Sequence, residues 1–269
     1  MVSTMKHIII ITGASSGMGA EFTRQVYKTT ALGKDATEMW LIAREDDQLA
    51  AIADELHGRD ITVRTWAFDL CGAAGAERVH ELLNTEAENG KFVVDLLINC
   101  AGFGTYGPFA ETDPAREMAM IDLNCTALTG ICGFVLPHMT RGGRIINVAS
   151  LAAFLPLGNF AVYAATKSYV LSFSVALAAE LHESGISVCA LCPGSVSTNF
   201  ANVASNGKRR EVLNGCDPCK VVSHCLRRSA RGAKIALWRP KWKITAFMSR
   251  FIGRYIGARY TYLFNKRPH

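Results

Sequence analysis

The stretch that decides the fold is Thr12-Gly13-Ala14-Ser15-Ser16-Gly17-Met18-Gly19, which directly follows the apolar run His7–Thr12. This run has the length and composition of a strand, and the segment after it, Met18–Thr30, has the length of a helix. Glycines let the backbone turn tightly and approach a ligand closely, and the start of the following helix can hold a pyrophosphate. Strand, glycine turn and helix therefore predict the first unit of a dinucleotide-binding fold.

The rest of the chain continues this alternation of strand-like and helix-like segments. Apolar runs of strand length lie at His7–Thr12, Met39–Ala43, Thr62–Ala67, Val93–Asn99, Arg144–Val148, Ser187–Leu191 and Lys234–Leu237. Helix-length segments include Met18–Thr30, Glu45–Leu56, Ala74–Glu88, Pro114–Met139 and Phe160–Glu183. Nearly continuous hydrophobicity is typical of strands buried on both faces, and short crossovers produce right-handed βαβ units. We predict an α/β fold: one Rossmann-like domain over residues 1–237, doubly wound around a mostly parallel, seven-stranded sheet.

Composition limits the class of protein. The chain of 269 residues is 49% hydrophobic and 19% charged, which excludes a disordered protein and supplies apolar material for one large core. The first apolar run is too short for a signal peptide, and no stretch approaches the roughly 18 apolar residues of a membrane span. Nine cysteines without a signal peptide indicate reduced thiols. We therefore expect a cytoplasmic protein.

The end of the second predicted strand bears on the choice of cofactor. In a dinucleotide fold, an acidic residue near this point binds the ribose 2′-hydroxyl of NAD. This chain has Ala43 there, followed by Arg44, whose guanidinium suits the 2′-phosphate of NADP. The alternative is that Arg44 only extends into solvent, and the acidic residues Glu45, Asp46 and Asp47 next to it weaken the argument. NADP(H) is favoured over NAD(H).

A candidate catalytic group lies in the second half of the chain. Tyr163 and Lys167 are four residues apart on one predicted helix, so that their side chains are neighbours. Ser150 ends the strand before this helix, and Asn124 lies in the helix before that strand. Taken alone, Ser150 would be interpreted as a turn or cap residue and Asn124 as a polar helix residue. Their combination in this order indicates a shared site.

These motifs together resemble the short-chain dehydrogenase/reductase family. The glycine spacing matches its cofactor loop, and Ser150, Tyr163, Lys167 and Asn124 match its catalytic tetrad. Three further motifs agree: Asp69-Leu70, Asn99-Cys100-Ala101-Gly102 and Pro193-Gly194-Ser195-Val196-Ser197-Thr198. Cys100 departs from the family pattern, which has a second Asn at this position. The resemblance covers roughly residues 6–237.

The resemblance implies a set of cofactor-binding residues. They are Gly13, Ser15, Ser16, Gly17, Met18, Gly19, Arg44, Asp69, Leu70, Asn99, Ala101, Gly102, Tyr163, Lys167, Pro193, Gly194, Val196 and Thr198. Thr198 would hold the nicotinamide carboxamide, and Lys167 the nicotinamide ribose. We interpret Asn99 as a residue that braces the sheet more than one that touches the cofactor.

The charge that develops during carbonyl reduction indicates the role of each catalytic residue. Negative charge builds up on the carbonyl oxygen, which must be stabilised and protonated. We expect Tyr163 to be the general acid/base, with its pKa lowered by the Lys167 ammonium, and Ser150 to hydrogen-bond the substrate oxygen. Asn124 would hold a water that links Lys167 to solvent.

The sequence leaves the substrate and two further classes of function open. The apolar segment Leu151–Phe160 beside the catalytic serine suits a hydrophobic ketone or alcohol: a hydroxysteroid or ketosteroid first, with a 3-oxoacyl group or a small carbonyl compound as alternatives. The loop 195–215 would cover the substrate, and its cations Lys208, Arg209 and Arg210 are equally compatible with a solvated surface. A non-catalytic NADP(H)-binding regulator is the second class, disfavoured by the intact Tyr163. A nucleic-acid binder lacks a recognisable motif.

The cysteines raise the question of a metal site. Cys189-x-x-Cys192 and Cys216-x-x-Cys219 superficially resemble a four-cysteine zinc site. The first pair belongs to a buried strand and its end, where cysteine acts as a small hydrophobe. Asp217 instead predicts the N-cap of a helix that begins at Pro218. We expect no metal.

The net charge of +6 is concentrated at one end of the chain. From Pro218 onward there are thirteen Lys and Arg residues and no Asp or Glu. We treat residues 238–269 as a basic, amphipathic C-terminal extension. Seven apolar residues in it follow a helical period: Ile244, Phe247, Met248, Phe251, Ile252, Tyr255 and Ile256. The basic residues among and beside them are Lys241, Lys243, Arg250, Arg254, Arg259, Lys266 and Arg267.

Two interpretations of this extension remain open. In one, the stripe packs on its own domain or on a sister subunit and covers the substrate pocket. In the other, it lies on an anionic membrane as a peripheral, reversible contact. The absence of carboxylates favours the membrane, because docking on a protein does not require it. We also expect a homodimer or homotetramer formed through Pro114–Met139 and Phe160–Glu183, as the resemblance implies.

Overall fold

The protein is built around one parallel sheet. The structure is a computed structural model that describes residues 5–29, 37–209, 212 and 214–265. The strands are β1 (Lys6–Thr12), β2 (Glu38–Ala43), β3 (Thr62–Ala67), β4 (Phe92–Asn99), β5 (Arg144–Val148), β6 (Ser187–Leu191) and β7 (Ile235–Ala236). Their order is β3-β2-β1-β4-β5-β6-β7, and each pair of neighbours is parallel. The predicted doubly wound fold is confirmed, with the sheet wholly rather than mostly parallel.

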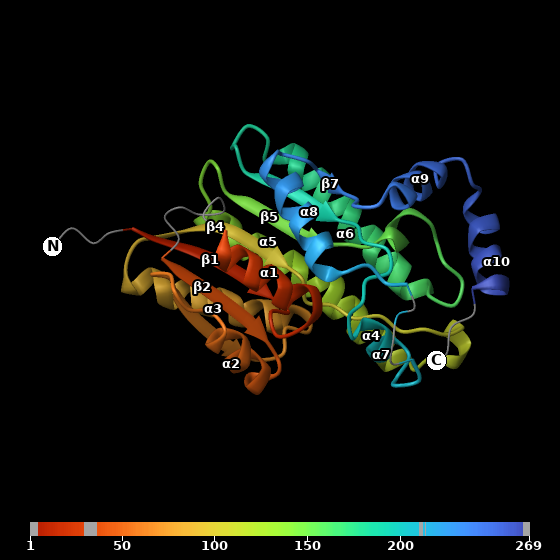
Figure 1. The fold of residues 1–269 in the computed structure, drawn as a ribbon, viewed down its shortest axis with the longest axis horizontal. Helices are drawn as coiled ribbons and strands as arrows, with labels where there is room; N and C mark the ends of the chain where they lie inside the picture. Colours follow the sequence, from red (N-terminus) through yellow and green to blue (C-terminus); the bar gives the residue numbers. More distant parts are fainter. Residues whose placement is uncertain (1–4, 30–36, 210–211, 213, 266–269) are drawn as a thin grey trace.

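Helices cover both faces of this sheet (Figure 1). They are α1 (Gly17–Lys28), α2 (Asp46–Asp54), α3 (Gly72–Asn89), α4 (Pro114–Ile121), α5 (Leu128–Val135), α6 (Ala161–Glu180), α7 (Phe200–Ala204), α8 (Pro218–Ala230), α9 (Pro240–Met248) and α10 (Arg254–Phe264). Short 3₁₀ turns are η2 (Phe109–Glu111), η4 (Leu136–His138) and η5 (Leu151–Phe154), and η3 (Asp122–Ala127) is a turn of π-helix. Asp217 caps α8 by accepting from the Cys219 N–H, as predicted.

Each face of the sheet has its own core. Along β1, Ile9 and Ile11 point to the core shared with α1, α2 and α8, whereas Ile8 and Ile10 point to the core shared with α3, α5 and α6. Successive strand residues point to opposite faces, and both faces are covered here. This explains why the run Ile8–Ile11 is apolar without alternation.

Two helical stretches, Pro114–His138 and Ala161–Glu180, are long and apolar enough to cross a membrane by length and composition. Both pack on the sheet: Leu128 and Ile131 of the first and Val170 of the second belong to one of its cores. The first stretch changes pitch at the π turn η3, which contains Asn124. Such turns are frequent at functional sites.

Several predicted boundaries shift. The last strand is two residues long, and the first helix ends at Lys28, while Thr30 lies outside the described residues. The loop 195–215 contains the short helix α7, and Arg210 in that loop lies outside the described residues.

In the C-terminal extension, the prediction of one continuous helical stripe is wrong. The stripe Ile244–Ile256 is interrupted, because the chain leaves the helix after Met248 and begins α10 at Arg254. The helix breaks here for two reasons. The Ser249 hydroxyl donates a hydrogen bond to the Ala246 carbonyl, and Gly253 disfavours a helical backbone because glycine loses more conformational entropy than other residues. Nor does the stripe pack on the domain: its members are 40% to 79% exposed. Lys266 and Arg267 lie outside the described residues.

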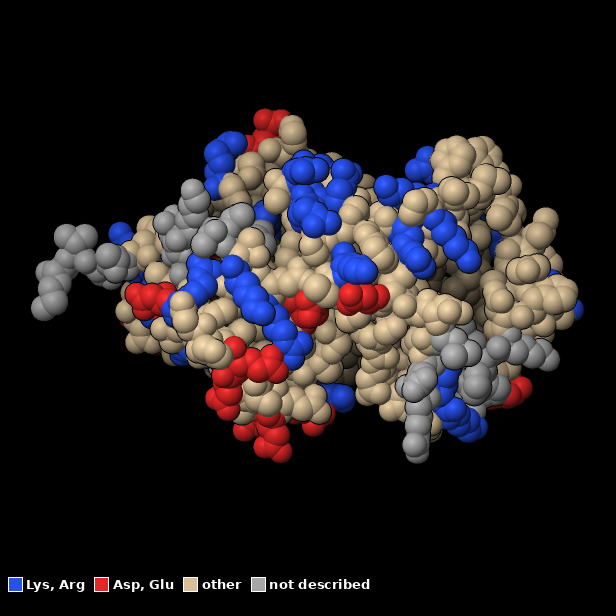
Figure 2. Space-filling view, in the orientation of Figure 1, with Lys and Arg blue, Asp and Glu red and all other residues tan. Residues whose placement is uncertain are grey.

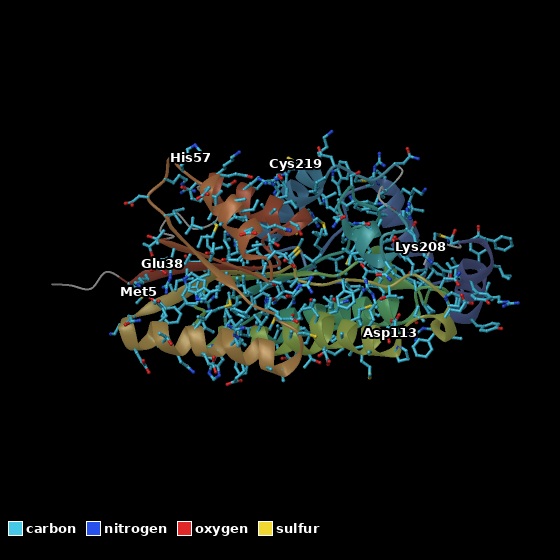
Figure 3. The ribbon with its side chains drawn as sticks, turned by 90° about the horizontal axis from the view of Figure 1, so that it is seen from below. Met5, Glu38, His57, Asp113, Lys208 and Cys219 are labelled. Carbon is cyan, nitrogen blue, oxygen red and sulfur yellow. The ribbon has the colours of Figure 1, made fainter. Side chains whose placement is uncertain are left out.

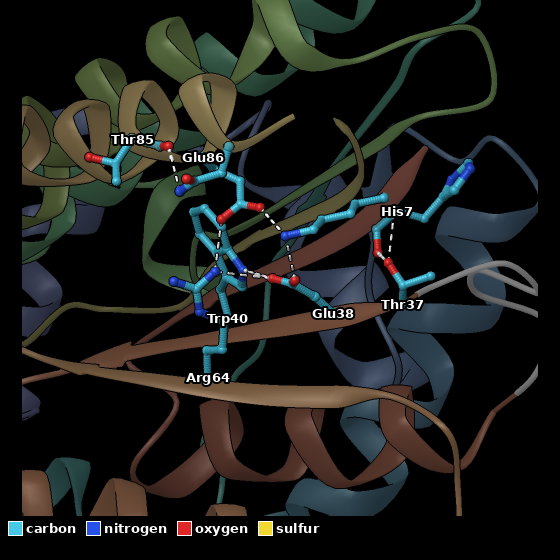
Figure 4. Close-up of polar contacts among 9 residues, drawn as sticks. His7, Thr37, Glu38, Trp40, Arg64, Thr85 and Glu86 are labelled. Atoms are coloured by element: carbon cyan, nitrogen blue, oxygen red, sulfur yellow. Dashed lines mark hydrogen bonds and ion pairs between the residues drawn. The ribbon is translucent and has the colours of Figure 1, made fainter. Parts of the chain in front are cut away.

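The amino ends of the strands carry a network of charges (Figure 4). Lys6 and Arg64 each contact both Glu38 and Glu86. Glu38 also accepts a hydrogen bond from the Trp40 indole at 3.0 Å. The carboxylates are almost completely buried, so their charges depend on these partners. In Figure 3, Glu38 and Met5 lie at this end of the sheet, and Lys208 and Asp113 lie at the other.

Candidate active site

The glycine loop after β1 is tightly held. Gly13 and Gly17 have φ of +65° and +53°, which a residue with a β-carbon rarely adopts. A β-carbon on Gly13 would lie 2.8 Å from the Ala101 Cα, and one on Gly19 would lie 1.9 Å from the Gly13 oxygen. Only glycines allow this loop to sit between β1, α1 and the turn after β4.

The start of α1 is open to an anion. Ser16 is its N-cap, yet the Ser16 side chain makes no capping hydrogen bond, and the first turn contains no acid. The first-turn N–H groups, including that of Met18, therefore receive no side-chain oxygen from the cap. Thr198 lies across from this loop, since a β-carbon on Gly17 would be 3.5 Å from the Thr198 Cβ. Ser15, between the two glycines, is half-buried. The loop and helix start thus fit a dinucleotide pyrophosphate.

The adenosine end is set by the edges of β2 and β3. Ala43 is buried, and the Arg44 side chain beside it is 68% exposed and 3.9 Å from a Glu45 oxygen. An exposed ion pair of this length contributes little, so the guanidinium is available to a phosphate. Asp69 accepts from the Cys71 N–H at 3.0 Å, and the adjacent Leu70 is buried.

The turn after β4 is anchored by a residue that the sequence analysis missed. The Thr12 hydroxyl accepts from the backbone N–H groups of Cys100 and Ala101, at 3.1 and 3.3 Å. Thr12 and this turn lie at the carboxyl ends of the paired strands β1 and β4. The strand pairing itself was the signal that could have identified Thr12.

Asn99 faces the sheet. Its side-chain amide donates to Asn147 Oδ1 at 2.9 Å and to Cys132 Sγ at 3.2 Å, and the residue is 3% exposed. Asn147 continues the chain of bonds to the Ser174 hydroxyl on α6. This geometry agrees with the interpretation of Asn99 as a brace, and its contact with the cofactor stays a prediction.

Three of the four catalytic candidates converge on α6 and the end of β5. The Lys167 ammonium donates to the carbonyl oxygen of Val148, the last residue of β5, at 2.9 Å and lies 5.8 Å from the centre of the Tyr163 ring. The Ser150 hydroxyl, two residues after β5, accepts from the Ala152 N–H at 3.1 Å and donates to the Pro193 oxygen at 3.5 Å. The i, i+4 spacing on α6 produces the predicted neighbours.

Lys167 is buried, and burial lowers the pKa of its ammonium from 10.5 to about 8. A charge without water is disfavoured unless an opposite charge replaces the solvent. Gly102 contributes to this enclosure, because a β-carbon there would lie 3.4 Å from the Lys167 nitrogen. The lysine is thus prepared for a polar ligand at the carboxyl edge of the sheet.

Asn124 braces the backbone. Its amide donates to the Phe103 oxygen at 3.0 Å and to the Thr166 hydroxyl at 3.1 Å, and its oxygen accepts from the Phe103 N–H at 3.2 Å. A β-carbon on Gly102 would come within 2.7 Å of that oxygen. Asn124 therefore positions the Gly102–Phe103 turn against α6. The water relay through Asn124 stays a prediction.

An aromatic cluster surrounds Tyr163. Phe160 stacks on its ring at 4.2 Å between centroids, and Phe200 of α7 lies at 5.3 Å. Tyr106 packs on Phe160 in turn, at 4.7 Å. A β-carbon on Gly104 would be within about 3 Å of Phe200 and Tyr163, so this glycine makes room for the rings. Sequence reasoning found the segment that contains Phe160 but missed Phe200, Tyr106 and Gly104, which converge only in the folded chain.

Comparison with known proteins agrees with this geometry. A family model described as short chain dehydrogenase matches residues 7–209. An uncharacterized oxidoreductase from Staphylococcus saprophyticus is 30% identical over 216 residues, which cover 79% of this chain and 88% of that protein. A serine 3-dehydrogenase from Agrobacterium fabrum is 29% identical over 221 residues, 78% of this chain and 80% of that protein. The solved structure of a short-chain dehydrogenase from Sphingobium yanoikuyae in complex with NADPH has a TM-score of 0.75 and 27% identity, and covers 92% of this chain and 94% of that one.

The chain belongs to the short-chain dehydrogenase family. It is an NAD(P)-dependent oxidoreductase that acts on CH–OH groups. The segment matched by the family model ends at residue 209, before α8, α9 and α10.

Proposed function

We propose that this protein is an NADP(H)-dependent oxidoreductase for the carbonyl or secondary alcohol group of a hydrophobic substrate, with a hydroxysteroid or ketosteroid as the first candidate. The observation that carries the proposal is the aromatic and aliphatic surrounding of Tyr163. Phe160 and Phe200 contact its ring, and Leu157, Ala152 and Phe103 pack around the same cluster. A site with such walls favours an apolar ligand held by a few polar groups.

The polar groups divide the proton chemistry among them. When bound, the nicotinamide cofactor would supply or accept the hydride. Tyr163 gives its phenolic proton to the carbonyl oxygen during reduction and takes it back during oxidation. The Ser150 hydroxyl turns from Pro193 to donate to the same oxygen, which stabilises the developing charge. Lys167 holds positive charge beside the Tyr163 ring and favours the phenolate form.

The preference for NADP(H) rests on Ala43 and Arg44. Ala43 leaves no carboxylate at the end of β2 to repel a 2′-phosphate, and the exposed guanidinium of Arg44 offers it charged donors. Glu45 lies near enough to compete for that guanidinium. The preference is therefore a proposal that cofactor titration must decide.

A small hydroxy amino acid is the contrasting substrate, suggested by the serine 3-dehydrogenase relative. Its carboxylate would need a cation in the pocket. The nearest candidate on α4, Arg116, already donates to the Thr105 hydroxyl at 3.2 Å and to the Val203 oxygen at 2.6 Å. Those bonds make Arg116 a clamp between α4 and α7, which favours the hydrophobic substrate.

The test is a screen that follows the absorbance of the reduced nicotinamide, with NADPH and NADH in parallel. Ketosteroids, 3-oxoacyl thioesters and small aldehydes are the reductive substrates, and L-serine with NADP⁺ is the oxidative one. We expect the highest kcat/KM for a ketosteroid with NADPH. Turnover confined to L-serine or to small aldehydes would contradict the hydrophobic substrate, and better use of NADH would contradict the cofactor.

We also propose that the protein is a homodimer or homotetramer. The outer faces of α4 and α6 expose Met118, Tyr169 and Val175, which support a contact between copies of the chain. A sedimentation mass near 29.2 kDa at micromolar concentration would contradict this proposal.

A further inference from the structure

The C-terminal helices α9 and α10 each contact the domain through a few residues on one side of the helix. Trp242 of α9 is 5% exposed and lies so close to the Pro193-Gly194 turn that a β-carbon on Gly194 would be 2.4 Å from its indole nitrogen. On α10, the Thr261 hydroxyl accepts from the Gly158 N–H at 2.8 Å, and the backbone carbonyl oxygen of Tyr262 accepts from the Asn159 side-chain amide at 3.0 Å. These contacts fix which face of each helix points away from the domain.

The outward face is apolar to an extent that is unusual for a surface. Phe251, Tyr255 and Phe264 are 70% or more exposed. The remaining exposed apolar residues of this face are Ile244, Phe247, Met248, Ile252, Ile256, Tyr260 and Leu263. We call this set the C-terminal face. An exposed apolar surface of this size marks an interaction site.

The charges beside the C-terminal face are all of one sign. Lys241, Lys243, Arg250, Arg254 and Arg259 are exposed on α9, α10 and the segment between them, and no Asp or Glu follows Asp217 in the sequence. Figure 2 shows this end of the molecule, around α9 and α10, as tan with blue side chains. The partner must therefore accept apolar and cationic groups side by side.

A second copy of the same face does not meet this requirement. A two-fold contact between C-terminal faces would bring five cations from each copy together with no carboxylate on either side, which repels. An anionic bilayer meets it, since aliphatic and aromatic side chains enter the acyl boundary while lysines and arginines reach the headgroups. We propose that the C-terminal face docks on an anionic lipid bilayer.

The position of α10 gives this docking a consequence for the site. The residues that α10 holds, Gly158 and Asn159, directly precede Phe160, which stacks on Tyr163. A bilayer against the C-terminal face would lie beside the aromatic cluster. If the proposed hydrophobic substrate is correct, it would reach Tyr163 from the lipid; this last step rests on the proposed function, whereas docking itself does not.

The test is co-sedimentation of the full chain with vesicles of phosphatidylglycerol and phosphatidylcholine in equal parts, and with vesicles of phosphatidylcholine alone. We expect tight binding to the anionic vesicles, at least about tenfold weaker binding to the neutral ones, and release as salt rises from about 0.1 M to about 1 M. Recovery of the protein in the supernatant with anionic vesicles at low salt would overturn the proposal.

Matched variants separate the C-terminal face from the rest of the surface. Phe251→Ser with Tyr255→Ser should lower the partition coefficient at least about tenfold, whereas Phe109→Ser, at another exposed phenylalanine, should not. Lys243→Glu with Arg254→Glu should lower it similarly, and Lys28→Glu with Lys91→Glu, an equal change in net charge, should lower it far less.

A measurement without lipid tests the remaining alternative, in which a second copy of the chain covers the C-terminal face. NADPH titration of each variant checks that the domain is folded, independently of any substrate. If Phe251→Ser with Tyr255→Ser halves the sedimentation mass without lipid and leaves vesicle binding unchanged, the C-terminal face joins two copies of the chain and the bilayer proposal is wrong.

Discussion

Two lysines, the partly exposed Lys6 and the buried Lys167, lie at opposite edges of the same sheet and behave in opposite ways. At the amino edge, hydrogen bonds from Lys6 to Glu86 and Glu38 raise the pKa of the lysine above 10.5. At the carboxyl edge, burial lowers the pKa of Lys167 to about 8, and no ion pair to Lys167 occurs within the described residues. The difference is the presence of carboxylates. A charge whose partner is part of the fold serves stability, and a charge without one is available to a ligand.

The two lysines also give opposite signs to the pH dependence of stability. Lys6 has a raised pKa in the folded state, so its contribution is present below pH 10.5 and is lost as the pH rises through the folded value. Lys167 has a lowered pKa, so the unfolded chain binds its proton more strongly between about pH 8 and 10.5. The destabilisation of the folded state by Lys167 is therefore complete below pH 8 and disappears as the pH rises from about 8 to 10.5.

The largest effect that we predict is at the carboxyl edge. Tyr163→Phe removes the phenolic proton and should lower turnover by about 10²–10⁴, with NADPH affinity nearly unchanged. Single-turnover kinetics and cofactor titration measure the two quantities separately. Near-normal turnover by this variant would show that Tyr163 is not the acid/base.

The second prediction breaks the network at the amino edge. Glu86→Gln leaves Lys6 and Arg64, whose side chains are 38% and 40% exposed, with one carboxylate fewer and should lower the free energy of unfolding by about 1 to 2 kcal/mol. Denaturation in urea measures this change. Glu88→Gln, at an exposed position on the same helix, is the matched control and should change stability little. NADPH affinity should be equal in both variants, and a loss confined to Glu86→Gln would show that the two edges are coupled.

The third prediction concerns Arg44, whose guanidinium is exposed and forms a long ion pair, 3.9 Å, with Glu45. Arg44→Gln should weaken NADPH binding about 10- to 100-fold by removing a charged donor, and should leave NADH binding unchanged. Addition of Ala43→Asp should shift the preference further toward NADH. Equal losses for both cofactors would place Arg44 away from the 2′-phosphate.

The smallest effect follows from the pKa of Lys167. As the pH rises through about 8, the ammonium loses its proton, and binding of the anionic cofactor should weaken by up to about tenfold per pH unit. Fluorescence titration with NADPH from about pH 6 to 9.5 measures it on the free protein. Lys167→Arg keeps its charge over this range, so its affinity should not follow the same curve.

Most of the fold could be predicted because its determinants are local. The glycine turn after β1, the continuous apolar strands and the spacing of Tyr163 and Lys167 are each encoded within one short segment. The side-chain partners of Asn99 and Asn124 could not be predicted in the same way. The pairing of β4 with β5 places Asn99 beside Asn147, and Asn124 of η3 meets Phe103 in the turn after β4 only in the folded chain.

The C-terminal extension shows the same division most clearly. Its sequence determined that the segment is basic, apolar and helical, since composition and period suffice for that. Only the tertiary structure decided that Trp242 and Thr261 face the domain while Phe251 and Tyr255 face away, and that the helix breaks between them. Period fixes which residues share a face, but burial depends on the shape of the surface that the face meets. In the same way, the sequence named Lys167, and the enclosure built by distant segments set its pKa.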